Sequence, residues 1–415
     1  MQLSQRKGFF AKPPNGRQLH EQRYKRECYA HIVSSQFFSR KGAAFVKLAF
    51  CNATHRWGGV KTWTVEVASA LSRLGHETVV YGRDPAFIER ALGMGLEAIK
   101  LDFGCDFNPA TIAFFLREFR ARGIDIVLVN LGKDLRTAGV AARLLGIALV
   151  QRVGLPKDRR NCLQVRLDNA LLKPHYLCPC HFIRDGMLHE LPFVKADRVS
   201  VVYTGKKPLV GTPAYPGQPL RLVSSSQVSV SKGHAELAHT LARLSNEGFD
   251  FFWEVVGTGN ALEALRSLCA ELGLADRTRF HGFVQDVPTL LRTCDVFVLP
   301  SYTEGLPNTL LEAMACGLVP VARDVGGVRE CLPPEPAAFL APFGPGINYA
   351  GWELLDSEKM PLYAPLKLIL SATQEQVNSW KNLALVHCRT NFSLDVQSRK
   401  LALFFAERLA AANII

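Results

Sequence analysis

The chain has 415 residues, of which 48% are hydrophobic and 21% are charged, and its formal net charge is +12. This length and composition suit a folded protein of two ordinary domains and exclude an intrinsically disordered chain. The sequence has no apolar stretch of about 18 residues, the length that crosses a bilayer, and no low-complexity run or solenoid repeat. Met1–Lys12 carries basic residues but no long apolar core, so it does not resemble a secretory signal and we expect a cytoplasmic protein.

Positive charge is concentrated at the start of the chain. Residues 1–47 contain ten Lys or Arg against two acidic residues, Glu21 and Glu27. We interpret residues 1–42 as a basic arm, which is a solvated and disordered tail, a segment attracted to an anionic membrane surface, or a nucleic-acid-binding segment. The last interpretation ranks lowest because the arm has no regular aromatic interleaving and no binding motif, so we expect no nucleic-acid partner.

The eleven cysteines are odd in number and scattered through predicted helices and strands. We therefore expect reduced, mostly buried thiols. Cys178 and Cys180, which precede His181, are spaced too closely for a C-x2-C zinc half-site, and no second pair completes one. The sequence therefore predicts no metal site.

Residues 43–205 predict a first α/β domain with a parallel sheet. A buried strand is followed by the glycine pair Gly58 and Gly59, and then by apolar residues at helical spacing up to Gly75. Such a strand–loop–helix–strand unit is typical of right-handed crossovers. Strands are predicted at residues 43–52, 77–81, 125–130 and 147–153, and helices at residues 60–74 and 137–145.

A second α/β domain is predicted over residues 206–390. Residues 200–220 contain seven glycines and prolines and predict a linker. Strands are then expected at residues 220–224, 251–256, 279–283, 295–300 and 319–322, and helices at residues 234–244, 261–272, 287–294 and 309–316. A C-terminal helix, residues 391–415, is expected to begin at Ser393. Ligands of open parallel sheets bind at the carboxyl ends of strands, so two such domains predict a central cleft.

The most informative segment is Val298–Glu330, which reads VLPSYTEGLPNTLLEAMACGLVPVARDVGGVRE. It places Glu304 after a strand and Glu312 eight residues later in a helix, for which Asn308 is a plausible N-cap. Backbone N–H groups around Gly305 and Leu306 are suited to anionic or hydroxyl oxygens.

This E-x7-E spacing, within the frame PS-x-x-EGLPN-x-x-LEAMA-x-G and before Gly326, Gly327 and Glu330, resembles the family-4 glycosyltransferases of the GT-B fold. The resemblance implies two Rossmann-like domains and a retaining transfer from a nucleotide-diphosphate sugar. It also implies that Glu304 contacts the donor sugar near its reacting carbon and that Glu312 binds the nucleotide ribose.

Further positions match the same family. Lys232, in Ser231-Lys232-Gly233, resembles a lysine that neutralises the departing diphosphate without a metal, so Glu304 and Lys232 are the candidate catalytic residues. The family usually has an arginine five positions earlier, where this chain has Gln227. Leaving-group stabilisation therefore depends on fewer charges, or a basic residue elsewhere substitutes. The remaining candidates for donor binding are the turn glycines Gly257 and Gly259, the base-lining Phe283, and the first-domain glycines Gly58 and Gly59.

In the first domain, many relatives have a histidine after a later strand, and this chain instead offers Asn130, Lys133 or Asp134. The sequence contains no Asp-x-Asp, which disfavours the metal-dependent single-domain class of sugar transferases, and we expect no cofactor beyond the nucleotide sugar.

The expected function is therefore sugar transfer to a glycan or lipid-linked acceptor, in the synthesis of cell-surface polysaccharide or lipopolysaccharide. The expected location is the cytoplasm, with peripheral attachment to the inner face of the membrane as an option. Two alternatives stay open: a catalytically impaired nucleotide-sugar-binding protein, and another GT-B enzyme such as a sugar-nucleotide epimerase or a phosphorylase.

Overall fold

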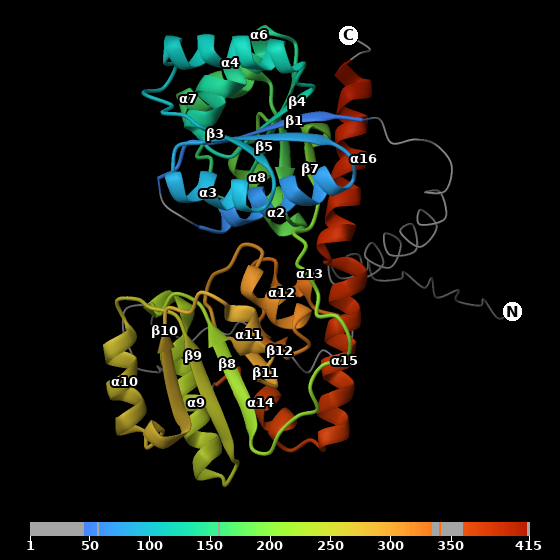
Figure 1. Ribbon diagram of the computed structural model, residues 1–415. Helices are drawn as coiled ribbons and strands as arrows, with labels where there is room; N and C mark the ends of the chain where they lie inside the picture. Colours follow the sequence, from blue (N-terminus) through green and yellow to red (C-terminus); the bar gives the residue numbers. More distant parts are fainter. Residues whose placement is uncertain (1–44, 56–57, 157, 334–339, 342–359, 413–415) are drawn as a thin grey trace, which may run out of the picture. The chain divides into compact units, whose positions relative to one another are not determined.

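A computed structural model describes residues 45–55, 58–156, 158–333, 340–341 and 360–412. The basic arm lies outside these residues. The described residues belong to one compact unit, Phe45–Ile415, which contains two parallel β-sheets (Figure 1). The two predicted Rossmann-like domains are confirmed. Within the described part of the chain, no helix combines the length and the apolar character that a membrane span requires.

The first sheet has seven parallel strands in the order β3-β2-β1-β4-β5-β6-β7. They are β1 (Lys47–Asn52), β2 (Glu77–Gly82), β3 (Glu97–Lys100), β4 (Ile126–Val129), β5 (Ala148–Arg152), β6 (His175–Cys178) and β7 (Val199–Val201). The central strands are buried on both faces, which explains their near-continuous apolar sequence. The carboxyl ends of β1, β4 and β5 lie at one edge of the sheet. The strand order reverses between β1 and β4, and ligands of open α/β sheets bind at such a reversal.

Helices cover both faces of this sheet. The connections are α2 (Gly59–Arg73), α3 (Pro85–Gly93), α4 (Pro109–Arg122), α5 (Gly132–Asp134), η2 (Leu135–Gly139), α6 (Val140–Leu144), α7 (Leu163–Leu172), α8 (His181–Glu190) and η3 (Ala196–Arg198). Side chains of α2 and α3 pack against one face, and side chains of α4, η2 and α6 pack against the other. The helix predicted over residues 137–145 starts earlier, at Gly132, because a short α-turn and a π-turn precede α6.

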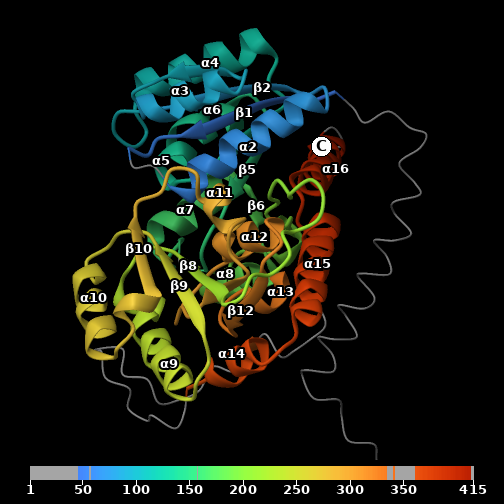
Figure 2. The ribbon, with the colours of Figure 1, turned by 60° about the horizontal axis from the view of Figure 1, so that its bottom comes forward.

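The second sheet has six parallel strands in the order β10-β9-β8-β11-β12-β13. They are β8 (Leu220–Ser225), β9 (Phe251–Val256), β10 (Thr278–Gly282), β11 (Val296–Leu299), β12 (Val319–Arg323) and β13 (Leu340–Ala341). The helices are η4 (Val230–Lys232), α9 (His234–Asn246), α10 (Leu262–Glu271), η5 (Ala275–Arg277), α11 (Val287–Leu291), α12 (Asn308–Ala315), α13 (Val328–Cys331), α14 (Tyr363–Leu370) and α15 (Gln374–Asn391). Figure 2 shows α9 and α10 next to β8, β9 and β10. The apolar side chains of these two helices pack with those of β8 and β9 in one hydrophobic core.

The chain crosses between the two domains twice, at neighbouring positions. The backbone N–H of Lys206 donates to Phe392 O at 2.7 Å, and that of Leu394 donates to Lys206 O at 2.9 Å. The last helix, α16 (Leu394–Ala412), then packs against the first domain through Leu401 and Phe405, beside α2 (Figure 1). The predicted start at Ser393 is confirmed, since its hydroxyl accepts from the backbone N–H of Val396 at 3.2 Å.

Candidate functional site

The two residues predicted to be catalytic lie in contact. Strand β11 ends at Leu299 and leads into the loop that carries Glu304, and η4 after β8 carries Lys232. The Lys232 Nζ and Glu304 Oε1 atoms are 2.6 Å apart, and the side chains are 25% and 13% exposed. This ion pair is partly open to solvent, so a ligand can reach both charges.

The loop that carries Lys232 is fixed against the end of β11. Gly233 has a φ of 70°, and a Cβ there would collide with the carbonyl of Pro300, so both conformation and space require glycine. The backbone N–H of Tyr302 also donates to Ser231 O at 3.0 Å. These backbone contacts hold Lys232 beside Glu304.

A second glycine pair holds the Glu304 loop from the other side. Gly326 has a φ of 59°, and a Cβ there would collide with the carbonyl of Glu304. The backbone N–H of Gly327 donates to Gly305 O at 2.7 Å. The GG-x-x-E part of the motif is therefore a support for the loop.

The backbone N–H groups of Gly305 and Leu306 are buried and have no acceptor among the residues that the structure describes. Helix α12 begins immediately afterwards, with Pro307 as the N-cap and no side chain capping it. The prediction that Asn308 is the N-cap is wrong: it is the first residue of α12, which leaves Glu312 in the middle of this eight-residue helix. Uncapped N–H groups and the helix dipole together favour an anion here.

The glycine pair of the first domain faces the same place. Gly58 is the N-cap of α2 and has no capping side chain. A Cβ on Gly59 would lie 3.8 Å from Asn308 Nδ2, so the start of α2 approaches the start of α12. Two uncapped helix N-termini, one from each domain, thus point positive partial charge into one region.

Glu312 has a partner that sequence reasoning missed. Lys206, from the crossing between the domains, places its Nζ 2.8 Å from Glu312 Oε1. Glu66 on α2 is also close, since burial raises its pKa, the charge of Lys206 lowers it and the charge of Glu312 raises it. Lys206 follows a strand in a glycine- and proline-rich linker, and nothing in that pattern distinguishes it from a solvated lysine.

The other donor-site candidates lie around neighbouring loops. A Cβ on Gly257 or Gly259 would collide with the carbonyl of Ser226 or Val228, so both glycines are required by packing against the loop after β8. Gln227 lies on that loop and is exposed. Their role in donor binding stays a prediction.

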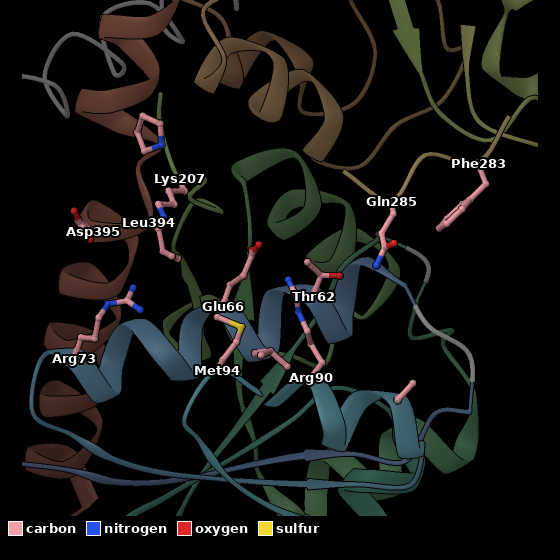
Figure 3. Close-up of a pocket in the computed structure, with 13 residues that line it drawn as sticks. Thr62, Glu66, Arg73, Arg90, Met94, Lys207, Phe283, Gln285, Leu394 and Asp395 are labelled. Carbon is pink, nitrogen blue, oxygen red and sulfur yellow. The ribbon is translucent and has the colours of Figure 1, made fainter. Parts of the chain in front are cut away.

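Phe283 is 81% exposed and lines a groove of about 990 Å³. Figure 3 shows Thr62 and Glu66 on α2, Arg90 on α3, and Gln285 and Phe283 toward the other end of this groove. The groove offers room for a ligand, and the base-lining role of Phe283 stays a prediction.

Two of the polar residues after β4, Asp134 and Lys133, have structural partners. Asp134 is fully buried and accepts from the backbone N–H groups of Ala53, Leu131 and Asn130, while burial raises its pKa to about 6. Lys133 Nζ donates to Gly104 O at 2.8 Å. Asp134 is therefore not available to face a sugar. Lys133 is half-buried and keeps further N–H donors, and Asn130 Oδ1 has no hydrogen-bond partner among the described residues, so a sugar contact by either stays a prediction.

Glu330 forms hydrogen bonds to the first domain that the sequence motif did not predict. Its carboxylate accepts from the backbone N–H groups of His181 and Phe182, at 2.8 and 2.7 Å, and from Tyr203 Oη at 2.9 Å. It therefore caps α8 of the first domain from a helix of the second. A carboxylate at a helix N-terminus is favourable because it interacts with the helix dipole. The two partners are about 150 positions apart, so no local sequence pattern predicts this contact.

The described residues contain no group of three or more His, Cys, Asp or Glu side chains arranged to hold a metal ion. Cys178 and Cys180 are buried at the end of β6 and the start of α8, and burial raises the pKa of both thiols to about 12. Of the cysteines that the structure describes, all are free thiols and only Cys105 and Cys162 are exposed, as expected.

Two parallel-sheet domains with a polar site at their facing strand ends define the GT-B class. The family model for "Glycosyltransferase Family 4" matches residues 57–206 of the chain. The model for "Glycosyl transferases group 1" matches residues 219–346. The chain belongs to the family-4 glycosyltransferases of the GT-B fold.

Curated relatives include an amylovoran biosynthesis glycosyltransferase from Erwinia amylovora, which is 31% identical over 135 residues, 31% of this chain and 33% of the relative. Another is an N,N'-diacetylbacillosaminyl-diphospho-undecaprenol alpha-1,3-N-acetylgalactosaminyltransferase from Campylobacter jejuni, 44% identical over 66 residues, 15% of this chain and 18% of the relative. The aligned segments thus span at most a third of the length of these two relatives.

Solved structures with a similar fold include a glycosyltransferase from Rickettsia africae, with a TM-score of 0.74 and 18% identity over 88% of this chain and 99% of that one. An Anabaena protein in complex with UDP-glucose has a TM-score of 0.66 and 18% identity over 88% of this chain and 99% of that one. At this identity the likeness concerns the fold alone.

Proposed function

We propose that this protein is a retaining glycosyltransferase that moves a sugar from a nucleotide-diphosphate sugar to a glycan or lipid-linked acceptor. The observation that carries the proposal is the Lys232–Glu304 pair, 2.6 Å apart, beside the uncapped start of α12. A cation, a carboxylate and free backbone N–H groups in one place suit a ligand with a diphosphate and a sugar.

The chemistry follows from where charge develops. As the bond to the leaving phosphate weakens, positive charge builds on the sugar ring and negative charge builds on the diphosphate. The carboxylate of Glu304 beside the ring and the ammonium of Lys232 beside the phosphates interact more strongly in that state, which lowers the barrier. The N–H groups of Gly305 and Leu306 and the starts of α2 and α12 add positive partial charge. We propose that these groups do this without a divalent metal.

Glu312 has a different role in this proposal. It holds the nucleotide ribose, which does not change during the reaction, so it contributes mainly uniform binding. Its carboxylate is 31% exposed and shares one oxygen with Lys206, which leaves acceptor capacity for ribose hydroxyls.

Steady-state kinetics on three variants test the assignment. Glu304→Gln and Lys232→Ala should each lower kcat by about 10² or more, if each group supplies about 2.7 kcal/mol in the transition state. Glu312→Gln should raise the donor KM more than it lowers kcat.

The matched control is Lys367→Ala, which removes another lysine–glutamate pair, Lys367 to Glu247 at 2.8 Å, in the same domain. It should leave both constants near their normal values. Near-normal kcat in both Glu304→Gln and Lys232→Ala, with folding verified by circular dichroism, would remove the assignment.

A nucleotide-sugar-binding protein without catalysis is the second candidate, and the exposed Gln227 at the usual arginine position favours it. Donor hydrolysis in the absence of acceptor separates the two, because a binder would bind nucleotide sugars without cleaving them. An epimerase would convert the donor's sugar without transferring it, and product analysis of the same reaction detects this.

The acceptor and the location are part of the proposal. One relative is named for amylovoran biosynthesis, and another is named for an undecaprenol-linked substrate. We place the protein by analogy in the synthesis of cell-surface polysaccharide or lipopolysaccharide, in the cytoplasm at the inner face of the membrane. The positive charge of residues 1–42 supports attraction to an anionic membrane surface.

A further inference from the structure

Arg152 is a cation at the carboxyl end of β5 that has no ion-pair partner among the described residues. Arg152 is the last residue of β5, and its side chain is 9% exposed. Its guanidinium carbon lies 4.4 Å from the centre of the Trp63 ring on α2. It makes no hydrogen bond or ion pair with any other residue that the structure describes, although other buried arginines do, such as Arg136 and Arg159 with Asp168.

The guanidinium nitrogens of Arg152 are not among the fully buried polar atoms that lack a partner, so they keep an opening to solvent. A largely buried charge whose one described partner is an aromatic ring gains from a ligand oxyanion that reaches it there. The charge of Asp158 acts on Arg152, but Asp158 Oδ2 accepts from the backbone N–H groups of Gly154 and Leu155. Burial lowers the pKa of Arg152 to about 10, which still leaves the guanidinium charged at neutral pH.

The position of Arg152 connects it to the catalytic loop. One of its terminal nitrogens would lie 3.6 Å from a Cβ on Gly154, and the Gly154 carbonyl oxygen would lie 3.1 Å from a Cβ on Gly305. Gly305 is the neighbour of Glu304. Trp63 belongs to the second turn of α2, whose uncapped start approaches α12. Gly154 thus lies between Arg152 and the loop that carries Glu304.

We propose that Arg152 binds a phosphate oxyanion in the cleft and supplies from the first domain the positive charge that this chain lacks at Gln227. The contact with the Trp63 ring uses none of the N–H donors, and a guanidinium can donate two hydrogen bonds to one phosphate. This inference deepens the proposed function. The phosphate belongs either to the donor diphosphate or to a phosphate-linked acceptor, and both present the same chemistry.

Binding measurements on the full chain test Arg152 without requiring turnover. The probes are UDP, GDP, ADP and dTDP with their matched nucleosides for the donor, and farnesyl diphosphate for a prenyl-linked acceptor. Arg152→Met should weaken the binding of one diphosphate probe by about tenfold or more and leave the matched nucleoside unchanged. Arg152→Lys should recover part of the loss, because it keeps the charge but not the paired donors.

Chemical rescue separates ligand binding from a structural role. Guanidinium chloride at low millimolar concentration should restore part of the affinity of Arg152→Met, whereas a merely misfolded site would not respond. The matched control is Arg243→Met, which removes an arginine stacked at 4.1 Å on Tyr363 and should leave binding unchanged. If Arg152→Met does not fold, Arg152→Lys and Arg152→Gln carry the same comparison.

The outcomes assign the source of the phosphate. Loss confined to the nucleotide probes identifies the donor, and loss confined to farnesyl diphosphate identifies the acceptor. Equal binding by wild type and Arg152→Met overturns the inference but leaves the proposed function standing. Wild-type protein that binds no nucleotide, yet binds farnesyl diphosphate through Arg152, refutes the proposed donor but supports the role of Arg152. Absence of binding to every probe overturns both.

Discussion

Gly305→Ala should push the loop that carries Glu304 slightly away from the first domain without straining the backbone at residue 305. A Cβ at this position would lie 2.9 Å from Leu155 Cδ2, 3.1 Å from Gly154 O and 3.3 Å from Ile183 Cδ1. Leu155 can relieve part of its contact by turning its exposed side chain, but the backbone carbonyl of Gly154 cannot turn away, so the two loops must move apart by a few tenths of an ångström. A misplacement of 1 Å costs about 10²-fold in rate, so we expect kcat to fall by roughly three- to fivefold.

The assay is kcat for donor hydrolysis and for transfer, together with the free energy of unfolding in urea. Leu155 is an exposed side chain, so the double variant Gly305→Ala with Leu155→Ala removes the closest contact and should recover part of the lost rate. Gly93→Ala is the control, because a Cβ there meets nothing within 4 Å. A Gly305→Ala enzyme with kcat within twofold of normal would refute the reasoning.

Three further predictions use other parts of the molecule. Turnover should persist in excess EDTA, and its loss with recovery in magnesium or manganese would show a metal requirement. Removing residues 1–41 should weaken sedimentation with anionic vesicles at low salt and leave donor hydrolysis unchanged; unchanged sedimentation would reduce the arm to a tail. Burial lowers the pKa of His234 from 6.5 to about 4. As the pH falls from 6.5 to 4, the His234 imidazole therefore binds a proton in the unfolded chain but not in the folded one, and the free energy of unfolding decreases over that window. Between pH 7 and 5 this loss should be about 2 kcal/mol, and urea unfolding of His234→Gln should show a correspondingly flatter pH dependence; an equal dependence in both proteins would contradict it.

The order of elements was predictable because buried parallel strands are short and apolar and glycines mark their turns. The second domain shows this well: strand β9 (Phe251–Val256) has the predicted bounds, and the other predicted strands agree within one or two residues. Helix ends were less predictable, because a cap depends on a hydrogen bond that residue type alone does not specify. Asn308 is a good N-cap by type, yet the chain enters α12 at Pro307 and the side chain of Asn308 caps nothing.

The contacts between residues far apart in the sequence were not predictable for a different physical reason. Periodicity and motif spacing report on neighbours along one element, whereas the Lys206–Glu312 and Glu330–His181 contacts join residues more than 100 positions apart. Each of these charged side chains has, in sequence, the same appearance as a solvated charge on a loop or helix. Burial is what distinguishes them, since a charge taken out of water must find a partner within the fold or in a ligand. Lys206 and Glu330 find their partners more than 100 positions away along the chain. The same requirement applied to Arg152, which has no hydrogen-bond or ion-pair partner among the described residues, favours the phosphate that it is proposed to bind.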